Sequence, residues 1–251
     1  MAESEHAQAA GALLRQSEDA PGVLRLTLQR PDAFNALSEA LIDAVTEALT
    51  RIAADPAVRV VVLAGAGRAF CAGHDLREMR AQPSHDYYRR LFDRCTRMML
   101  AIQRMPQPVI ARVHGIATAA GCQLVAMCDL AVAADDARFA VSGVNLGLFC
   151  STPGVALSRN LHRKHAMEML LTGEPVEARR ALEWGLVNRV VPDDRLAAET
   201  WKLARMLAEK PPATLAAGKR AFYQQMDMQV GRAYELASEV ISSSFAHEEG
   251  K

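Results

Sequence analysis

The chain has 251 residues, half of them apolar, and its 29 basic and 29 acidic side chains give no formal net charge. That length and composition suffice for a sizeable core in one α/β domain, and the balanced charge gives no footprint for nucleic acid or an anionic membrane. The five cysteines are odd in number and form no Cys-x-x-Cys pair, as is typical of a reduced protein without a metal site. Because residues 1–11 contain no Arg and resemble neither a signal nor a transit peptide, we expect a cytoplasmic location.

The first half of the chain alternates strand and helix patterns. Residues 23–28 are rich in β-branched residues and leucine and stop at an Arg-Pro pair, which predicts a strand. Ser38 is a good helix N-cap, and the apolar residues after it share one helical face up to an Asp-Pro pair. The apolar run 58–64 predicts a strand covered on both faces. Residues 84–105 predict a long helix that two prolines stop.

Another strand–turn–helix pattern follows. Residues 109–113 predict a buried strand, 120–127 a helix and 130–134 a further short strand. The apolar stretch 115–134 is long enough for a hydropathy scan to mark it as a membrane span. It contains an Asp and begins with a Gly- and Ala-rich turn, so a turn into a buried helix is the better interpretation and we expect no membrane span.

From about residue 154 onward the patterns are almost wholly helical. We expect an α/β core over residues 1–195 and a C-terminal helical region over residues 196–251. Apolar positions in that region, such as Leu203 and Phe222, should be buried against the core or against a neighbouring chain, which favours an oligomer.

A Gly-Ala-Gly turn at 65–67 follows the apolar strand, as in a dinucleotide-binding fingerprint. That fingerprint needs Gly at the position of Phe70, so an ordinary turn is the better interpretation and we expect no binding of NAD.

Two further turns of small residues each lead into a predicted helix. The first is Cys-Ala-Gly-His-Asp-Leu at 71–76, where Asp75 is expected to cap a short helix, and the second is Gly-Ile-Ala-Thr-Ala-Ala-Gly at 115–121, where a helix begins near Ala120. Small residues let a ligand approach the backbone, and the first N–H groups of a helix lack intrahelical partners. If the turns face one another, they can hold the oxygen of a thioester carbonyl as it becomes an enolate. Close packing of Ala and Gly residues is the alternative.

The order and spacing of these motifs resemble those of the crotonase family, also called the enoyl-CoA hydratase/isomerase superfamily. Besides the two turns, the resemblance includes Arg-Pro-x-x-x-Asn-Ala-Leu at 30–37, Cys-Asp at 128–129, Leu-Gly and Pro-Gly within 146–154, and a Leu-Thr-Gly-Glu motif within 171–187. It covers most of the chain. It implies an α/β fold, a crotonase-like spiral of ββα units with a C-terminal helical trimerisation region, assembled as a homotrimer or hexamer.

The resemblance also implies a site. The backbone N–H groups of His74 and Ala120 would form an oxyanion hole for an acyl-CoA thioester, with CoA as part of the substrate and no separate cofactor. The substrate-binding residues that it implies are Ala72, Gly73, His74, Asp75, Leu76, Arg77 and Ala120.

Two positions depart from the family pattern. Where a hydratase of this family carries its catalytic glutamates, this chain has Gln123 and Gly143. Gln cannot take up a proton at neutral pH, and Gly has no side chain. No Asp or Glu occurs between Asp136 and Glu168, so a shifted alignment does not supply the second carboxylate. We therefore expect an acyl-CoA-binding protein, nominally an enoyl-CoA hydratase/isomerase, with weak or altered activity.

Other side chains leave the chemistry open. His74 is a group that can titrate near neutral pH, although a lone loop histidine is more often a spectator. Cys150 and Ser151 are candidate nucleophiles of a CoA-thioester hydrolase, but no paired base is visible. Lys219 is expected on a solvated helix face, or near the CoA phosphates of a neighbouring subunit as the resemblance suggests. A non-catalytic acyl-CoA binder or modulator of hetero-oligomers is the remaining alternative.

Overall fold

The computed structural model describes residues 13–246, so the N-terminal segment used to judge a leader peptide lies outside the described residues. The larger of two sheets has the strand order β1-β2-β3-β4-β6-β9, and all its neighbours are parallel except β1 and β2. The smaller sheet has the order β5-β7-β8. The strands are β1 (Leu14–Ala20), β2 (Val23–Leu28), β3 (Val60–Gly65), β4 (Val109–Val113), β5 (Ile116–Thr118), β6 (Leu130–Ala134), β7 (Arg138–Ala140), β8 (Val176–Glu177) and β9 (Arg189–Val191).

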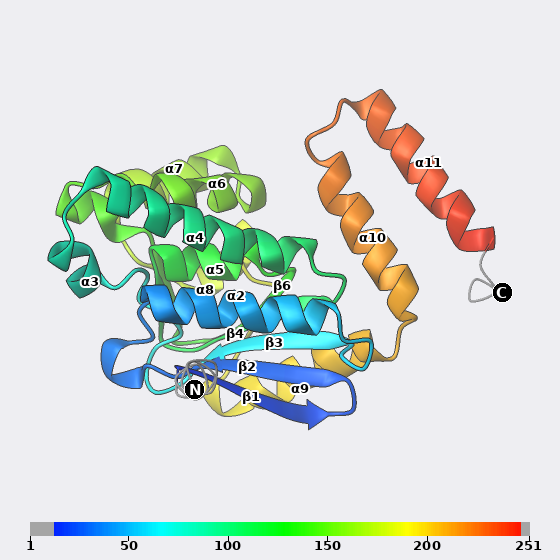
Figure 1. Ribbon diagram of the computed structural model, residues 1–251, viewed down its shortest axis with the longest axis horizontal. Coiled ribbons are helices and arrows are strands. Elements are labelled where there is room, and N and C mark those ends of the chain that lie inside the picture. Colours follow the sequence, from blue (N-terminus) through cyan, green and yellow to red (C-terminus); the bar gives the residue numbers. More distant parts are fainter. Residues whose placement is uncertain (1–12, 247–251) are drawn as a thin grey trace, which may run out of the picture.

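Helices cover the larger sheet, with α2 and α4 on one side and α9 on the other (Figure 1). The α-helices are α2 (Glu39–Ala53), α3 (Leu76–Ala81), α4 (His85–Arg104), α5 (Ala120–Met127), α6 (Ser151–Asn160), α7 (Arg163–Thr172), α8 (Ala178–Trp184), α9 (Asp193–Ala208), α10 (Pro212–Gln225) and α11 (Val230–Ala246), and the 3₁₀ helices are η1 (Pro31–Ala33) and η2 (Ser142–Leu146). None of the helices in residues 13–246 is both long and apolar enough to cross a membrane.

Two successive turns of the chain each add a strand to the larger sheet, then a strand to the smaller one, and then a helix: β4, β5 and α5, followed by β6, β7 and η2. In the larger sheet β3, β4 and β6 are neighbours. In the smaller sheet β5 pairs with β7, and Cys71, which follows β3, bridges Ala117 of β5. The first turn begins at Cys71 and the second follows β5. Because Cys71 and β5 are paired at the smaller sheet, the two turns lie side by side.

The predicted core elements are confirmed. Ser38 caps α2 by accepting the N–H of Leu41 at 3.2 Å, and Ser84 and Asp75 cap α4 and α3 in the same way. The strands that the sequence did not predict are short or poorly buried. β9 has only three residues, and β1 is an edge strand of seven residues in which Leu14 alone is fully buried.

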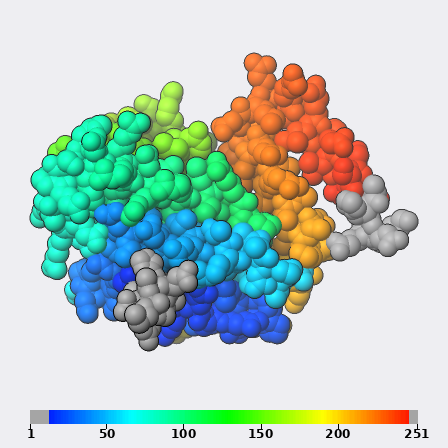
Figure 2. Space-filling model, viewed as in Figure 1, coloured from blue at the N-terminus to red at the C-terminus, as the bar shows by residue number. Residues whose placement is uncertain are grey.

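Of the three C-terminal helices, α9 packs on the sheet, whereas α10 and α11 keep large apolar side chains exposed. Leu196, Leu203 and Ala204 of α9 are buried, and α9 contacts β3, β4 and β6. The helices α10 and α11, orange and red in Figure 2, project from one end of the molecule, with α10 against the body and α11 beyond it. They carry large apolar side chains that are more than half exposed, among them Phe222, Tyr234 and Phe245. The division into residues 1–195 and 196–251 stays a prediction.

Lys219 connects α10 to the core. Its ammonium group donates to Asp129 Oδ2 at 2.6 Å and to the carbonyl oxygens of Ile102 and Gln107 at 2.9 Å each, and only 8% of the side chain is exposed. The hydroxyl of Tyr223 donates to the other carboxylate oxygen of Asp129 at 2.8 Å. The expectation of a solvated helix face at Lys219 is therefore wrong, and its three donors already have acceptors within the chain.

Candidate functional site

The two small-residue turns face one another. Cys71 donates its N–H to Ile116 O at 3.1 Å and accepts the N–H of Thr118 at 3.0 Å, which sets the first turn in register with β5. Gly121, in the first turn of α5, lies so close to Cys71 that a Cβ at this position would overlap the Cys71 backbone. The close packing considered from the sequence and the facing of the two turns are thus the same arrangement.

Gly73 is a second point of close approach between the turns. Its φ is +86°, and a Cβ at this position would lie 2.9 Å from Ala119 Cβ and 3.2 Å from Ala120 N. A side chain here would be strained and would also crowd the start of α5. Gly73 therefore lets the backbone around His74 come within a few ångströms of the Ala120 N–H.

The residues before and after His74 in the chain are both hydrogen-bonded to Leu37, which lies on one side of them. Leu37 donates its N–H to Gly73 O at 2.7 Å and accepts the N–H of Asp75 at 3.0 Å. Successive peptide groups of an extended chain point to opposite edges, so the N–H of His74 points away from Leu37. No acceptor within residues 13–246 is hydrogen-bonded to that N–H.

The N–H of Ala120 is free for a different reason. It is the first N–H of α5, where no intrahelical acceptor exists, and no other acceptor is bonded to it in the described part of the chain. Ala119 before it has φ 50° and ψ −118°, a conformation unusual for a non-glycine residue, and is held there by donating to Ala140 O at 2.8 Å. The arrangement places two unpaired donors on adjoining turns, one of them at the positive end of a helix dipole.

The side chain of His74 is mostly buried. Its ring meets the Phe92 ring edge-on at a centroid distance of 5.2 Å, and its Nε2 has no hydrogen-bond partner among the described residues. Burial lowers the pKa of His74 from 6.5 to about 4. Of the two interpretations of His74, this favours the spectator over a group that titrates near neutral pH, because desolvation keeps the ring neutral.

Gln123 lies in the first turn of α5, and 6% of the residue is exposed. Helical side chains lean toward the N-terminus of their helix, so the amide lies over the turn that starts at Ala120. Its Oε1 is buried without a partner in residues 13–246. An unpaired neutral acceptor thus stands at the first of the two altered positions.

Gly143 lies in η2, which the contact of 3.3 Å between Ser142 Oγ and Thr118 Oγ1 places beside the second turn. A Cβ on Gly143 would lie 2.6 Å from Cys150 Sγ and 2.7 Å from Leu148 O. The thiol and the backbone of the loop before α6 therefore occupy the space that a side chain at this position would need.

Neither candidate nucleophile has a base. Burial raises the pKa of the Cys150 thiol, only partly offset by a hydrogen bond with the Gly143 backbone, so the thiol stays protonated at neutral pH. Ser151 is exposed, and its hydroxyl contacts only Phe149 O at 3.4 Å. No imidazole, amine or carboxylate in residues 13–246 is hydrogen-bonded to either, and the ring of His165 is stacked on Trp184 instead.

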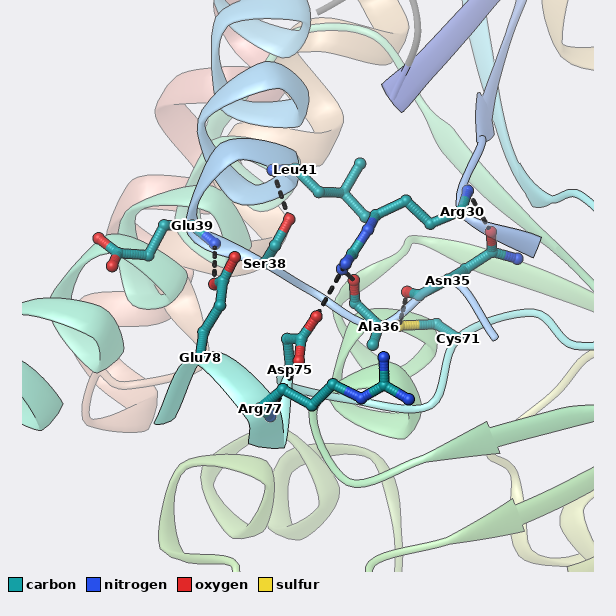
Figure 3. Close-up of polar contacts among 10 residues, drawn as sticks. All are labelled: Arg30, Asn35, Ala36, Ser38, Glu39, Leu41, Cys71, Asp75, Arg77 and Glu78. Carbon is teal, nitrogen blue, oxygen red and sulfur yellow. Dashed lines mark hydrogen bonds and ion pairs between the residues drawn. The ribbon is translucent and has the colours of Figure 1, made fainter. Parts of the chain in front are cut away.

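The remaining residues of the first turn are divided between structure and surface. Asp75 caps α3 (Figure 3) and is buried. Leu76 and Arg77, next to it in the sequence, are exposed. The sequence did not single out Arg30, which binds Asp75, or the contact between Cys150 and Gly143. The motif at 30–37 contains Arg30 but does not reveal its partner. Within residues 13–246 no group of three or more His, Cys, Asp or Glu side chains could hold a metal ion.

The family model, the related sequences and the solved structures that match this chain all point to the same family. The model of the enoyl-CoA hydratase/isomerase family matches residues 18–251. Enoyl-CoA hydratase domain-containing protein 3 of Xenopus laevis is 45% identical over 99% of this chain and 84% of its own length. A crystal structure of an enoyl-CoA hydratase from Mycobacterium smegmatis is 59% identical, with a TM-score of 0.93 over 95% of this chain and 93% of that one. The structure of human enoyl-CoA hydratase domain-containing protein 3 is 41% identical, with a TM-score of 0.91 over 95% and 94% of the two chains.

One prediction is corrected by these relatives. The Xenopus protein and its human and mouse counterparts are named as mitochondrial, which contradicts the cytoplasmic location predicted from the sequence.

The predicted fold and the resemblance on which it rested are both confirmed, since the chain superposes on solved enoyl-CoA hydratases of the crotonase fold over nearly all of its length. By sequence and by fold, this chain belongs to the enoyl-CoA hydratase/isomerase family.

Proposed function

We propose that the protein binds an acyl-CoA thioester and holds its carbonyl oxygen between the backbone N–H groups of His74 and Ala120. The observation that carries this proposal is the pair of unpaired donors on adjoining turns, brought together by Gly73. An oxygen that gains negative charge as an enolate forms gains more from such donors than the ground-state carbonyl does. Nominally, this is the chemistry of an enoyl-CoA hydratase or isomerase.

The rest of the first turn would bind the substrate around that oxygen. Ala72 and Gly73 present backbone to the ligand, and the exposed Leu76 and Arg77 lie just beyond, where they can contact the CoA moiety. CoA enters as part of the substrate, and the proposed reaction uses no separate cofactor.

Proton transfer is the weak part of this site. Gln123 cannot exchange a proton at neutral pH, Gly143 has no side chain, and the Cys150 thiol beside it is protonated. His74 is neutral, and with a pKa of about 4 it is a weak base. The site would therefore stabilise charge on the thioester oxygen without a strong, positioned acid or base, so we propose weak or altered hydratase activity.

A non-catalytic acyl-CoA binder or modulator of hetero-oligomers is the second candidate. The filled space next to Gly143 favours it, because a water molecule and a carboxylate would need that space. A CoA-thioester hydrolase acting through Cys150 or Ser151 is disfavoured because neither group has a base.

The exposed apolar side chains of α10 and α11 support a homotrimer or hexamer, because apolar surface of this extent is usually covered. Light scattering at micromolar concentration should give the mass of three or six chains, and a monomer mass would contradict this part of the proposal.

Thermal-shift titration tests the binding. Crotonyl-CoA and acetyl-CoA should raise the Tm, since a ligand at a hundred times its Kd stabilises the folded state by about 2.7 kcal/mol, whereas NAD should not. Gly73→Ala should weaken the response by crowding Ala120. The matched control is Gly218→Ala on α10, where a Cβ meets nothing within 4 Å. A response to NAD alone, or equal responses in the two variants, would contradict the proposal.

A further inference from the structure

Arg30 follows β2 and joins two segments that are distant in sequence. Its backbone N–H donates to Asn35 Oδ1 at 2.9 Å. Its guanidinium donates through Nη1 to the carbonyl oxygen of Ala36 and through Nη2 to Asp75 Oδ2 at 2.8 Å (Figure 3). The side chains of Arg30 and Asp75 are 22% and 10% exposed, so the pair is largely withdrawn from water.

One acceptor of this guanidinium, Asp75, directly follows His74 in the chain. The other, the carbonyl of Ala36, belongs to the segment that is hydrogen-bonded to the residues before and after His74. Ala36 precedes Leu37, whose N–H and C=O are bonded to Gly73 and Asp75. The second carboxylate oxygen of Asp75 accepts the N–H of Arg77 at 3.0 Å and caps α3. Because a guanidinium is a rigid planar fork, it fixes the position of the Ala36 carbonyl relative to Asp75. The peptide group that carries the His74 N–H is held between those two points.

We propose that Arg30 is a positioning residue, which orients the His74 N–H toward the substrate carbonyl through Asp75 and the Ala36 carbonyl. This rests on the proposed function, in which that N–H receives the thioester oxygen. Arg30 acts on the substrate only through the turn. A donor displaced by about 1 Å can lower turnover about 10²-fold while most of the ligand contacts persist. Loss of Arg30 should therefore reduce polarisation of the bound carbonyl more than it reduces affinity.

The ionisation of Asp75 provides a second observable effect, a pH dependence in variants that lack Arg30. Burial alone would raise the pKa of this carboxyl, but the hydrogen bonds from Arg30 and from the Arg77 N–H outweigh burial and lower the pKa. Without Arg30 the pKa should rise. A cap of this kind is present above the pKa of the carboxyl and is lost as the pH falls through it. The turn in an Arg30 variant should therefore loosen in mild acid, where the wild type does not.

The other titratable groups around Asp75 are either hydrogen-bonded to other residues or buried. Glu78 of α3 accepts the backbone N–H of Glu39 at 2.9 Å, and the Glu39 carboxylate is paired with Arg94 at 2.6 Å. Tyr87 of α4 is buried, and its pKa is raised by burial and by the neighbouring carboxylates. His74 itself is neutral above a pH of about 4. An acid-dependent loss that sets in at a higher pH in the Arg30 variant than in the wild type would then report on Asp75.

The test uses difference infrared spectroscopy of crotonyl-CoA labelled with ¹³C at the thioester carbonyl, together with calorimetric Kd values. The proteins are the wild type, Arg30→Met, Arg30→Lys and the control Arg25→Met. Arg25 forms an ion pair of similar burial with Asp19 at 3.0 Å, in the β1–β2 hairpin, away from both turns. We expect the wild type and Arg25→Met to show the same lowering of the carbonyl stretch on binding. Arg30→Met should lose most of it with a change in Kd below about 10-fold, and Arg30→Lys should be intermediate.

The pH dependence separates positioning from general damage. As the pH is lowered from 7, the residual shift of Arg30→Met should decline at a higher pH than the shift of the wild type does. A full shift in Arg30→Met overturns the proposal. If Arg30→Met does not fold, Arg30→Lys decides in the same way, with a reduced shift at unchanged Tm supporting positioning and a full shift overturning it. A wild type that binds crotonyl-CoA with no shift at all contradicts the proposed function itself, and this inference fails with it.

Discussion

Placing glutamates at both positions, by Gln123→Glu and Gly143→Glu, tests the packing around Gly143 and the proposed lack of a proton-transfer group together. The new Cβ at position 143 would stand 2.6 Å from Cys150 Sγ and 2.7 Å from Leu148 O. Overpacking of this kind costs about 1–3 kcal/mol. In a chain of 251 residues that corresponds to a fall in Tm of about 2–6 °C. The backbone of Gly143 has no positive φ, so the penalty is one of space and not of backbone conformation.

Cys150→Ala separates the two contacts. It removes the thiol but leaves the Leu148 carbonyl, so it should recover about 1 kcal/mol in the Gly143→Glu background, while in the wild type it should be neutral or slightly destabilising. Thermal denaturation of the four proteins of this double-mutant cycle measures the coupling. A Gly143→Glu protein with the Tm of the wild type would refute the claim that the space is filled.

Hydration of crotonyl-CoA measures the functional half of the same prediction. A positioned acid or base contributes about 10²–10⁴-fold to the rate. If the proposed function is right, the wild type has no such group at positions 123 and 143, and the triple variant with Gln123→Glu, Gly143→Glu and Cys150→Ala should hydrate crotonyl-CoA at least about 10²-fold faster, with little change in Kd. A wild type that already matches relatives bearing both glutamates would refute the reasoning.

Two further predictions concern buried ionisable groups. Lys219→Met leaves the Asp129 carboxylate largely buried without its cation, so the free energy of unfolding should fall by about 3–5 kcal/mol, as urea denaturation would show; a loss below about 1 kcal/mol would be that of a surface pair and would contradict it. The pKa of His74 is lowered from 6.5 to about 4, so the folded protein binds fewer protons than the unfolded chain between these values. Stability should therefore fall as the pH drops from about 6.5 toward about 4, with no contribution from this group above that range, and His74→Gln should show a shallower fall in the same unfolding assay. Identical pH profiles in the two proteins would disprove the burial argument.

The local elements of the fold could be predicted because each carries its own signal. A continuous apolar run gives β3, and Ser38 before an amphipathic stretch gives α2. β5 and β7 have three residues each and no distinctive composition, so their pairing could not be read from the sequence. That pairing, with the bridge from Cys71 to Ala117, is what brings the two turns together.

In the site, too, local features could be predicted from the sequence and contacts between distant residues could not. Small residues marked both turns, while the assignment of Gln123 and Gly143 to the positions of the family's glutamates, made from motif spacing, stays a prediction. The thiol of Cys150 next to Gly143 is a contact across a loop, and no local pattern encodes it. Lys219 is a stronger example, because its partner Asp129 is 90 residues away and a lysine on a helix is ordinarily solvated.

The most direct test of the central claim is a single-turnover experiment. The wild-type protein, in excess over crotonyl-CoA carrying a ¹³C label at the thioester carbonyl, is followed by NMR from the moment of mixing. If the backbone donors of His74 and Ala120 hold the carbonyl while no positioned carboxylate delivers or removes a proton, the carbonyl resonance should shift at once to that of a bound, polarised thioester. The enoyl group should then persist far longer than in a relative that carries both glutamates. Immediate conversion to 3-hydroxybutyryl-CoA, or a carbonyl resonance that stays at its free position, would contradict the account.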